Sequence, residues 1–167
     1  MYTLHPATMA DYEYCYRLCK TAMLTLFTKH WGGWKPEVFR SNFDPLDTTV
    51  IKVKGRRAGW YSIRDLESHL FLSDIYISPR YRGKGIGTSV IAKILRSSPH
   101  RTVRLTTFVD NPAINLYRRT GFHVDTVNDG VVNMLYTVTD SAGQQCVAPK
   151  RRSPISSLVA FNVILRV

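Results

Sequence analysis

The feature that most constrains this chain is a glycine-rich loop between an apolar segment and a helical one. Residues 75–77 are β-branched or aromatic, and after Pro79 three glycines follow at alternate positions: Gly83, Gly85 and Gly87. Such glycines leave backbone N–H groups uncovered and tolerate positive φ, so successive amides can converge on one anion. A helix that begins directly after the loop adds the positive end of its dipole. Because Arg82 and Lys84 add full charges, the pattern predicts a diphosphate site rather than a bare strand-to-helix turn.

Length and composition are those of one globular domain. The 167 residues suffice for a real core, and 44% hydrophobic with 21% charged residues argues against both disorder and membrane spanning. No apolar run is long enough to cross a bilayer, and no signal-peptide pattern opens the chain, so we expect a cytoplasmic protein. The three cysteines form no set with zinc-ligand spacing, so we expect reduced thiols and no metal.

The net charge of +11 suits an anionic ligand or nucleic acid. Four of the basic residues, and no acid, lie within residues 141–167. The others scatter over strands, loops and helices, whereas a nucleic-acid-binding surface calls for a basic stripe interleaved with aromatic residues. Nucleic acid is therefore the weaker alternative as a partner.

Hydrophobic periodicity predicts a strand, two helices and a three-stranded meander before the loop. The strand covers residues 2–5, and the first helix follows a capping box from Thr8 to Asp11 and runs to about Leu26. A second helix begins at Pro36. Strands are expected over 49–54, 58–63 and 70–77. In the last strand, alternation places Phe71, Ser73, Ile75 and Ile77 on one face, and Leu72, Asp74 and Tyr76 on the other.

After the loop we expect a helix over 85–97, a strand over 101–109 and a short helix. The short helix is capped by Asn111 and ends at Gly121. Residues 122–127 and 131–138 form a hairpin through Asn128-Asp129-Gly130. A strand, a helix and a further strand in succession favour a right-handed crossover and one parallel pair of strands.

The composition changes after Asp140. Residues 141–167 read as a basic linker followed by a β-prone C-terminal tail, Leu158 to Leu165, outside a first domain of residues 1–140. Such a strand must pair with something, either the edge of its own sheet or a second copy of the chain in a homodimer.

Two motifs at the right separation resemble those of the GNAT superfamily of acetyl-CoA-dependent N-acetyltransferases. The first is Arg82-Gly83-Lys84-Gly85-Ile86-Gly87, and the second runs from Asn111 through Leu116-Tyr117 to Gly121-Phe122. The resemblance covers about residues 1 to 140. It implies an α/β fold with a mixed, mostly antiparallel central sheet, a splayed parallel pair in its middle, and helices on both faces.

The resemblance also implies how the coenzyme is bound. Acetyl-CoA would be the co-substrate, with its pyrophosphate held by the loop residues Gly83, Lys84, Gly85, Ile86, Gly87 and Thr88, and with Arg82 adding charge. The main chain of Ile75, Tyr76 and Ile77 would bond the pantetheine arm, and one amide would polarise the thioester carbonyl. The second motif is one residue shorter than the usual form, so either Asp110 or Asn111 faces the coenzyme, and we choose Asn111.

Tyr117 matches the family tyrosine near the coenzyme sulfur, where its phenol would protonate the departing thiolate. The alternative is a packed helix aromatic. Some relatives carry a glutamate base where this chain has Thr106 and Thr107, so the base must come from elsewhere or be a chain of water molecules. Asp74 is the best-placed carboxylate, although a structural aspartate fits the sequence equally well.

Aromatic and acidic residues between the first two helices predict the acceptor side. Trp31, Trp34, Glu37 and Phe39 would hold an ammonium group by cation–π and ionic contacts, and the two tryptophans form either a lip over a pocket or a cap on the core. The expected reaction is acetyl transfer to a primary amine of a small molecule or a peptide, by direct attack through a tetrahedral intermediate. The alternatives are a non-catalytic acyl-CoA-binding regulator and a basic nucleic-acid-binding module.

Overall fold

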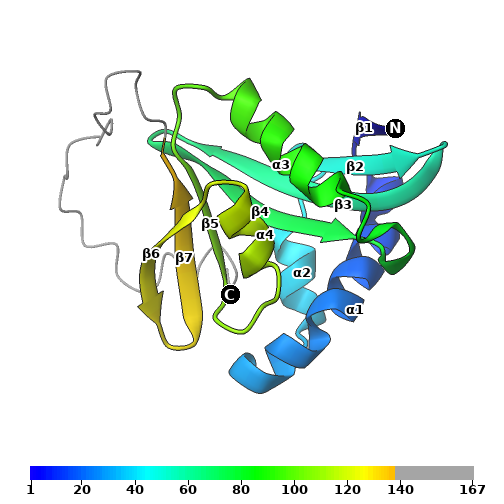
Figure 1. The fold of residues 1–167 in the computed structure, drawn as a ribbon. Helices are drawn as coiled ribbons and strands as arrows, with labels where there is room; N and C mark the ends of the chain where they lie inside the picture. Colours follow the sequence, from blue (N-terminus) through cyan, green and yellow to red (C-terminus); the bar gives the residue numbers. More distant parts are fainter. Residues whose placement is uncertain (138–167) are drawn as a thin grey trace.

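The computed structural model describes residues 1–137 and contains one seven-stranded sheet (Figure 1). Its strands lie in the order β1-β2-β3-β4-β5-β7-β6, and every neighbouring pair is antiparallel except β4 and β5. The strands are β1 (Tyr2–Pro6), β2 (Thr48–Val53), β3 (Arg56–Leu66), β4 (His69–Ile77), β5 (Val103–Phe108), β6 (His123–Asn128) and β7 (Val131–Tyr136). The predicted fold class is confirmed.

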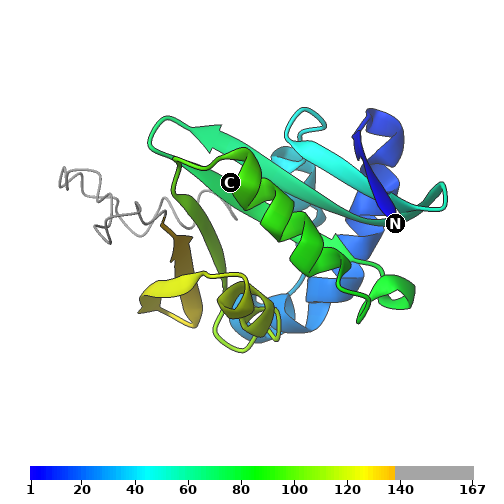
Figure 2. The same ribbon diagram turned by 45° about the horizontal axis from the view of Figure 1, so that its top comes forward.

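Helices cover both faces of the sheet. They are α1 (Tyr12–Trp31), α2 (Pro36–Asn42), α3 (Ile86–Ser97) and α4 (Ile114–Arg119), with single 3-10 turns η1 (Met9–Asp11) and η2 (Pro79–Tyr81). In Figure 2, α3 crosses in front of the sheet and α1 lies behind it. The larger core cluster joins α3 and α4 to the sheet, and a smaller one joins α1 to Trp60 with Phe39 of α2 packed against it.

The parallel pair in the middle of the sheet is paired over a short length only. β4 and β5 pair at Leu70–Val103 and Phe71–Arg104, and the ladder then stops. From residue 72 onward the edge of β4 that faces β5 therefore has no strand partner within residues 1–137. The expected splay is confirmed, and it leaves a row of backbone N–H and C=O groups available to a ligand.

The predicted alternation along β4 is wrong because the strand contains a β-bulge. The pairing with β3 goes from Ser62–Asp74 to Ile63–Leu72, so Ser73 has no opposite residue. Leu72 consequently joins the same core cluster as Ile75, three residues later, whereas strict alternation placed them on opposite faces. The bulge brings two consecutive polar residues, Ser73 and Asp74, to the wall of one cleft.

Most predicted elements are confirmed with shifted ends. The first helix continues past Leu26 to Trp31, because Phe27 and Trp31 pack against Phe108 of β5 and these contacts stabilise the additional turn. Helix α4 begins at Ile114, and Asn111 instead forms the turn before it, accepting a hydrogen bond from the Ala113 amide.

The predicted hairpin is present between β6 and β7, with positive φ at Asp129 (48°) and Gly130 (76°), as a type I′ turn requires. The domain boundary at Asp140 and the predicted tail strand lie outside the described residues. None of the helices in residues 1–137 combines the length and apolar character needed to cross a bilayer.

Candidate active site

A single cleft of about 630 Å³ runs from the glycine loop, along the open edge of β4, to the space between α1, α2 and the end of β5. The site residues predicted from the sequence all line this cleft except Lys84 and Glu37. Glu37 lies exposed on α2. The Lys84 ammonium lies 5.7 Å from the ring centroid of Tyr81 and borders a neighbouring hollow among other basic residues.

The glycine loop has the backbone geometry of an anion cradle. Gly83 and Gly85 have φ of 69° and 72°, values that strain any residue with a Cβ, and the space beside both is open. Gly85 is also the N-cap of the twelve-residue helix α3, whose first-turn amides therefore face the loop. Arg82 Nε donates to the carbonyl oxygen of Ile77 at 2.8 Å, which ties the loop to the end of β4.

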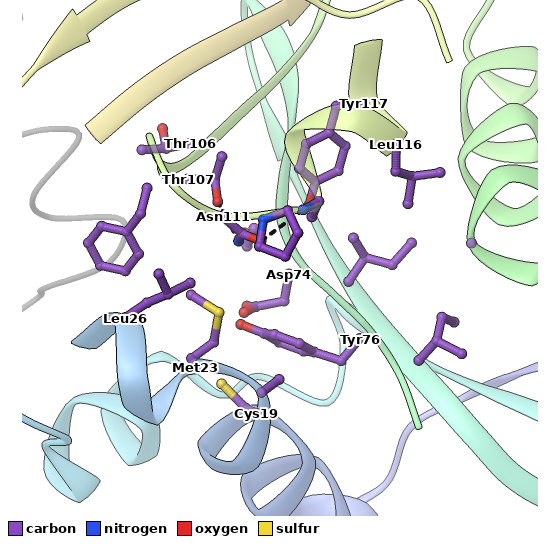
Figure 3. A pocket seen from close by; sticks show the side chains of 18 of the residues that line it. Cys19, Met23, Leu26, Asp74, Tyr76, Thr106, Thr107, Asn111, Leu116 and Tyr117 are labelled. Carbon is purple, nitrogen blue, oxygen red and sulfur yellow. Dashed lines mark hydrogen bonds between the residues drawn. The ribbon is translucent and has the colours of Figure 1, made fainter. Parts of the chain in front are cut away.

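Asp74 lies half-buried at the centre of the cleft, beside the hydroxyl of Tyr76 (Figure 3). Burial raises the pKa of this carboxyl to about 6, although a hydrogen bond with Tyr76 and the charge of Arg64 act in the opposite direction. The Tyr76 hydroxyl also hydrogen-bonds Cys19 of α1, and burial holds the pKa of that phenol well above its usual value. The carboxylate is thus supported by a neutral phenol rather than by an adjacent cation.

Tyr117 approaches the same space from α4, and Figure 3 shows its hydroxyl pointing toward Asp74. The residue is 7% exposed and packs against Phe122 with ring centroids 6.0 Å apart. Burial, and then the charge of Asp74, raise the pKa of its phenol. Tyr117 therefore stays protonated near neutral pH, the state in which a phenol donates a proton. Its hydroxyl has no hydrogen-bond partner among residues 1–137.

Asp110 and Asn111, the two residues that could face the cleft at the start of the second motif, have different surroundings. Asn111 lines the cleft, and its Nδ2 donates to Thr107 Oγ1 at 2.7 Å. Asp110 does not line the cleft and instead binds α1, through Lys29 at 2.5 Å and His30 at 2.8 Å. These contacts lower the pKa of Asp110 to about 2 and fasten the end of α1 to the loop after β5.

The end of the cleft between α1, α2 and β5 has an aromatic wall, which we define as Phe27, Trp31, Trp34, Phe39 and Phe108. Two pairs of its rings meet edge to face: the centroids of Trp31 and Phe108 are 4.6 Å apart, and those of Phe27 and Trp34 are 5.4 Å apart. Trp34 Nε1 donates to the Tyr16 hydroxyl at 3.0 Å. The two tryptophans are thus packed against neighbouring rings and border the cleft at the same time.

The match to known families agrees with this geometry. The family model described as "Acetyltransferase (GNAT) family" matches residues 13–122, a span that begins early in α1 and includes both motifs. The chain belongs to the GNAT acetyltransferase family.

Individual relatives of this GNAT chain are distant. An uncharacterized N-acetyltransferase of Methanocaldococcus jannaschii is 31% identical over 118 residues, which are 64% of this chain and 52% of that protein. An L-2,4-diaminobutyric acid acetyltransferase of Nocardia farcinica is 37% identical over 75 residues, 41% and 39% of the two chains. The matched parts make up between 25% and 52% of the curated relatives.

Among solved structures, an N-acetyltransferase of Thermoplasma acidophilum in complex with coenzyme A has the same fold. The TM-score is 0.61 at 16% identity, and the match covers 81% of this chain and 98% of that one. At this level of identity the likeness concerns the fold alone.

Sequence reasoning missed several residues that line the GNAT cleft. Met23, Leu26 and Phe27 come from α1, and Phe108 comes from the far end of β5. Ser73 and Asn42 also line the cleft, and their Oγ and Oδ1 atoms are buried without a hydrogen-bond partner in the described part of the chain. Only the i,i+4 continuation from Met23 to Phe27 was a usable signal.

Histidine, cysteine and acidic side chains do not gather in groups of three at metal-binding distance anywhere within residues 1–137. Cys15 and Cys19 are both buried free thiols. Burial raises the pKa of Cys15 to about 12 and that of Cys19 well above its usual value, so neither is an activated nucleophile.

Proposed function

We propose that this protein transfers an acetyl group from acetyl-CoA to a primary amine by direct attack of the amine. The observation that carries the proposal is the continuity of the cleft, which joins the glycine loop, the open edge of β4, Asp74 and Tyr117 in one space. Family membership and the acetyltransferase names of the relatives support it.

The residues fit the coenzyme at two places. The loop amides from Gly83 to Thr88 and the start of α3 would hold the pyrophosphate, because both present N–H groups and positive potential to an anion. The edge of β4 from Ile75 to Ile77 would bond the pantetheine arm, whose amides supply the donors and acceptors that β5 does not. Bound there, the thioester would present its acetyl group to the amine.

Asp74 and Tyr117 would handle the protons. An amine reaches the site as ammonium, and it has to lose a proton before it can attack. Asp74, whose pKa burial raises to about 6, would be the base that takes that proton, directly or through water. Tyr117 remains protonated and would donate to the sulfur that leaves. Cys19 and Tyr76 would hold the carboxylate in place from the α1 side.

A thiol-release assay with purified protein, acetyl-CoA and a panel of primary amines tests the proposal. Acetylated amine, identified by mass spectrometry, together with one equivalent of free coenzyme A is the expected result. Calorimetric binding of coenzyme A without turnover on any amine would favour the non-catalytic regulator. Absence of coenzyme binding would contradict the proposal as a whole.

The variant Tyr117→Phe separates catalysis from coenzyme binding. We expect kcat to fall roughly 10²-fold, the lower range for loss of a general acid, while the Kd for coenzyme A stays within about twofold. Tyr136→Phe is the matched control, since Tyr136 also packs at the core but does not line the cleft. Equal rates for Tyr117→Phe and the natural protein would remove Tyr117 from the mechanism.

We further infer that the protein works in the cytoplasm, because free buried thiols suit a reducing compartment. We also retain the proposal that Leu158 to Leu165 pairs with the sheet edge or with a second copy of the chain. The acceptor would be a small-molecule or peptide amine.

A further inference from the structure

The acceptor end of the cleft is apolar and flat-sided. The aromatic wall supplies five rings from α1, α2, β5 and the segment between the two helices, and Met23 and Leu26 extend the same surface along α1. Flat rings that meet edge to face leave slots into which a further ring or a branched aliphatic group packs well. A ligand body that is charged or heavily hydroxylated would lose its water against this surface without compensation.

Few charged side chains line the buried part of the cleft. Among the described residues, Asp74 is the only carboxylate that lines it. The lining cations Lys35, Arg82 and Arg119 are all exposed. Neutral polar side chains line the cleft as well, among them Thr106, Thr107 and Asn111. Ser73 Oγ and Asn42 Oδ1 are buried, neutral and without a hydrogen-bond partner in residues 1–137.

One carboxylate can neutralise one ammonium group. A second cation on the same small acceptor, as in a polyamine or a diamino acid, would lie against aromatic rings and neutral oxygens, with no counter-ion among the lining residues of 1–137. Cation–π contact and a neutral hydrogen bond recover part of the lost hydration, but less than an ion pair at the same depth does. A carboxylate on the acceptor would likewise find its cations only at the exposed rim.

We propose that the acceptor is a primary monoamine with an aromatic or similarly flat apolar body. This inference rests on the proposed acetyl transfer and names its acceptor class. The ammonium group lies at Asp74, next to the hydroxyls of Tyr76 and Tyr117, and the body lies against the aromatic wall. A single hydroxyl on that body has neutral polar side chains such as Thr106, Thr107 and Asn111 in the cleft wall, whereas a second ammonium group has no further carboxylate among the lining residues of 1–137.

The test compares 2-phenylethylamine with spermidine, lysine and 2,4-diaminobutyrate by thiol release. We expect kcat/KM for 2-phenylethylamine to exceed each of the others by about tenfold or more, as a matched apolar pocket commonly provides. The variant Met23→Glu adds a second carboxylate to the wall on a residue type that helices tolerate. It should lower the preference for 2-phenylethylamine over spermidine at least about tenfold.

Leu24→Glu is the matched control. Leu24 is the next residue on α1, but it is 42% exposed and does not line the cleft, so the same added charge should leave the preference unchanged. If both variants shift the preference equally, a long-range charge effect explains the result, and the proposed contact is wrong.

The outcomes separate the two proposals. Faster acetylation of spermidine or a diamino acid than of 2-phenylethylamine overturns the acceptor class while leaving acetyl transfer intact. If no amine is acetylated, the proposal of acetyl transfer is wrong. The acceptor class is then tested by measuring amine binding through tryptophan fluorescence in the presence of coenzyme A. Saturable binding of 2-phenylethylamine that Met23→Glu weakens supports the inference, and absence of binding refutes it.

Discussion

Replacing Asp74 by asparagine should make the protein more stable and less active at the same time. The side chain keeps its size and loses its charge. Burial raises the pKa of Asp74 from 3.8 to about 6, so the folded state binds this proton more tightly than the unfolded state does. The natural protein therefore loses stability as the pH rises from about 4 through about 6, and above that range the loss is complete.

The pKa shift sets the size of the effect. A difference of about 2 pKa units corresponds to about 3 kcal/mol, which is the upper limit of what Asp74→Asn can recover at pH 7. For a chain of this length, that is a rise in Tm on the order of 10 °C. Near pH 4 the two proteins should unfold at nearly the same temperature, because Asp74 is then neutral in both states. Loss of the base should lower kcat/KM at pH 7 by roughly 10²- to 10⁴-fold.

Thermal unfolding of both proteins between pH 4 and 8 provides the measurement, with Asp110→Asn as a control of opposite sign. The pKa of Asp110 is lowered to about 2 by Lys29 and His30, so its stabilising effect is present above about pH 4 and disappears as the pH falls through 2. Asp110→Asn should therefore lower the Tm at pH 7. A lower Tm for Asp74→Asn at pH 7, or a difference that does not change between pH 4 and 7, would refute the reasoning.

Three further predictions concern the frame of the site. Gly59→Ala should destabilise the protein by roughly 1 to 3 kcal/mol in urea unfolding and weaken coenzyme binding, because its Cβ would lie 2.3 Å from the Tyr76 carbonyl oxygen; an unchanged midpoint would show that β3 can move away. Acetyl-CoA at about 100 times its Kd should raise the unfolding free energy by about 2.7 kcal/mol, and a denaturant midpoint that does not move would argue against a coenzyme site. Removing every residue after Asp140 should lower the Tm or change the elution volume in sizing chromatography, and the proposed pairing of Leu158 to Leu165 fails if both stay the same.

The features of the fold that depend on a few neighbouring residues were predicted from the sequence. The glycine loop, the turn at Asp129-Gly130 and the Pro36 helix start each depend on a few adjacent residues, and all three are present. The bulge at Ser73 was missed, because one extra residue in a strand leaves an apolar pattern that still looks like plain alternation.

The aromatic wall was only half predicted for a related reason. Its tryptophans are easily recognised in the sequence. Phe27 and Phe108, however, are in contact although they lie 81 residues apart in the sequence, and no local sequence pattern around either residue indicates this contact. Enrichment of aromatic and acidic residues predicts Glu37 on the acceptor side, but the turn of α2 leaves Glu37 exposed and outside the cleft. Sequence separation therefore predicted which residues lie close together within one helix or strand, but not which residues of two different elements do.

The separation of β4 from β5 gives this sheet an interior edge. Exposed edges of sheets invite other chains to add strands, and many proteins protect them with charges or prolines. Here the open edge lies between two strands and beneath helices on both faces, which favours a thin ligand over another polypeptide with side chains on alternate sides. What can enter is a slender chain with spaced donors and acceptors. The separation of β4 from β5 therefore creates a binding groove and also favours thin ligands, independently of the charges and side chains that line the groove.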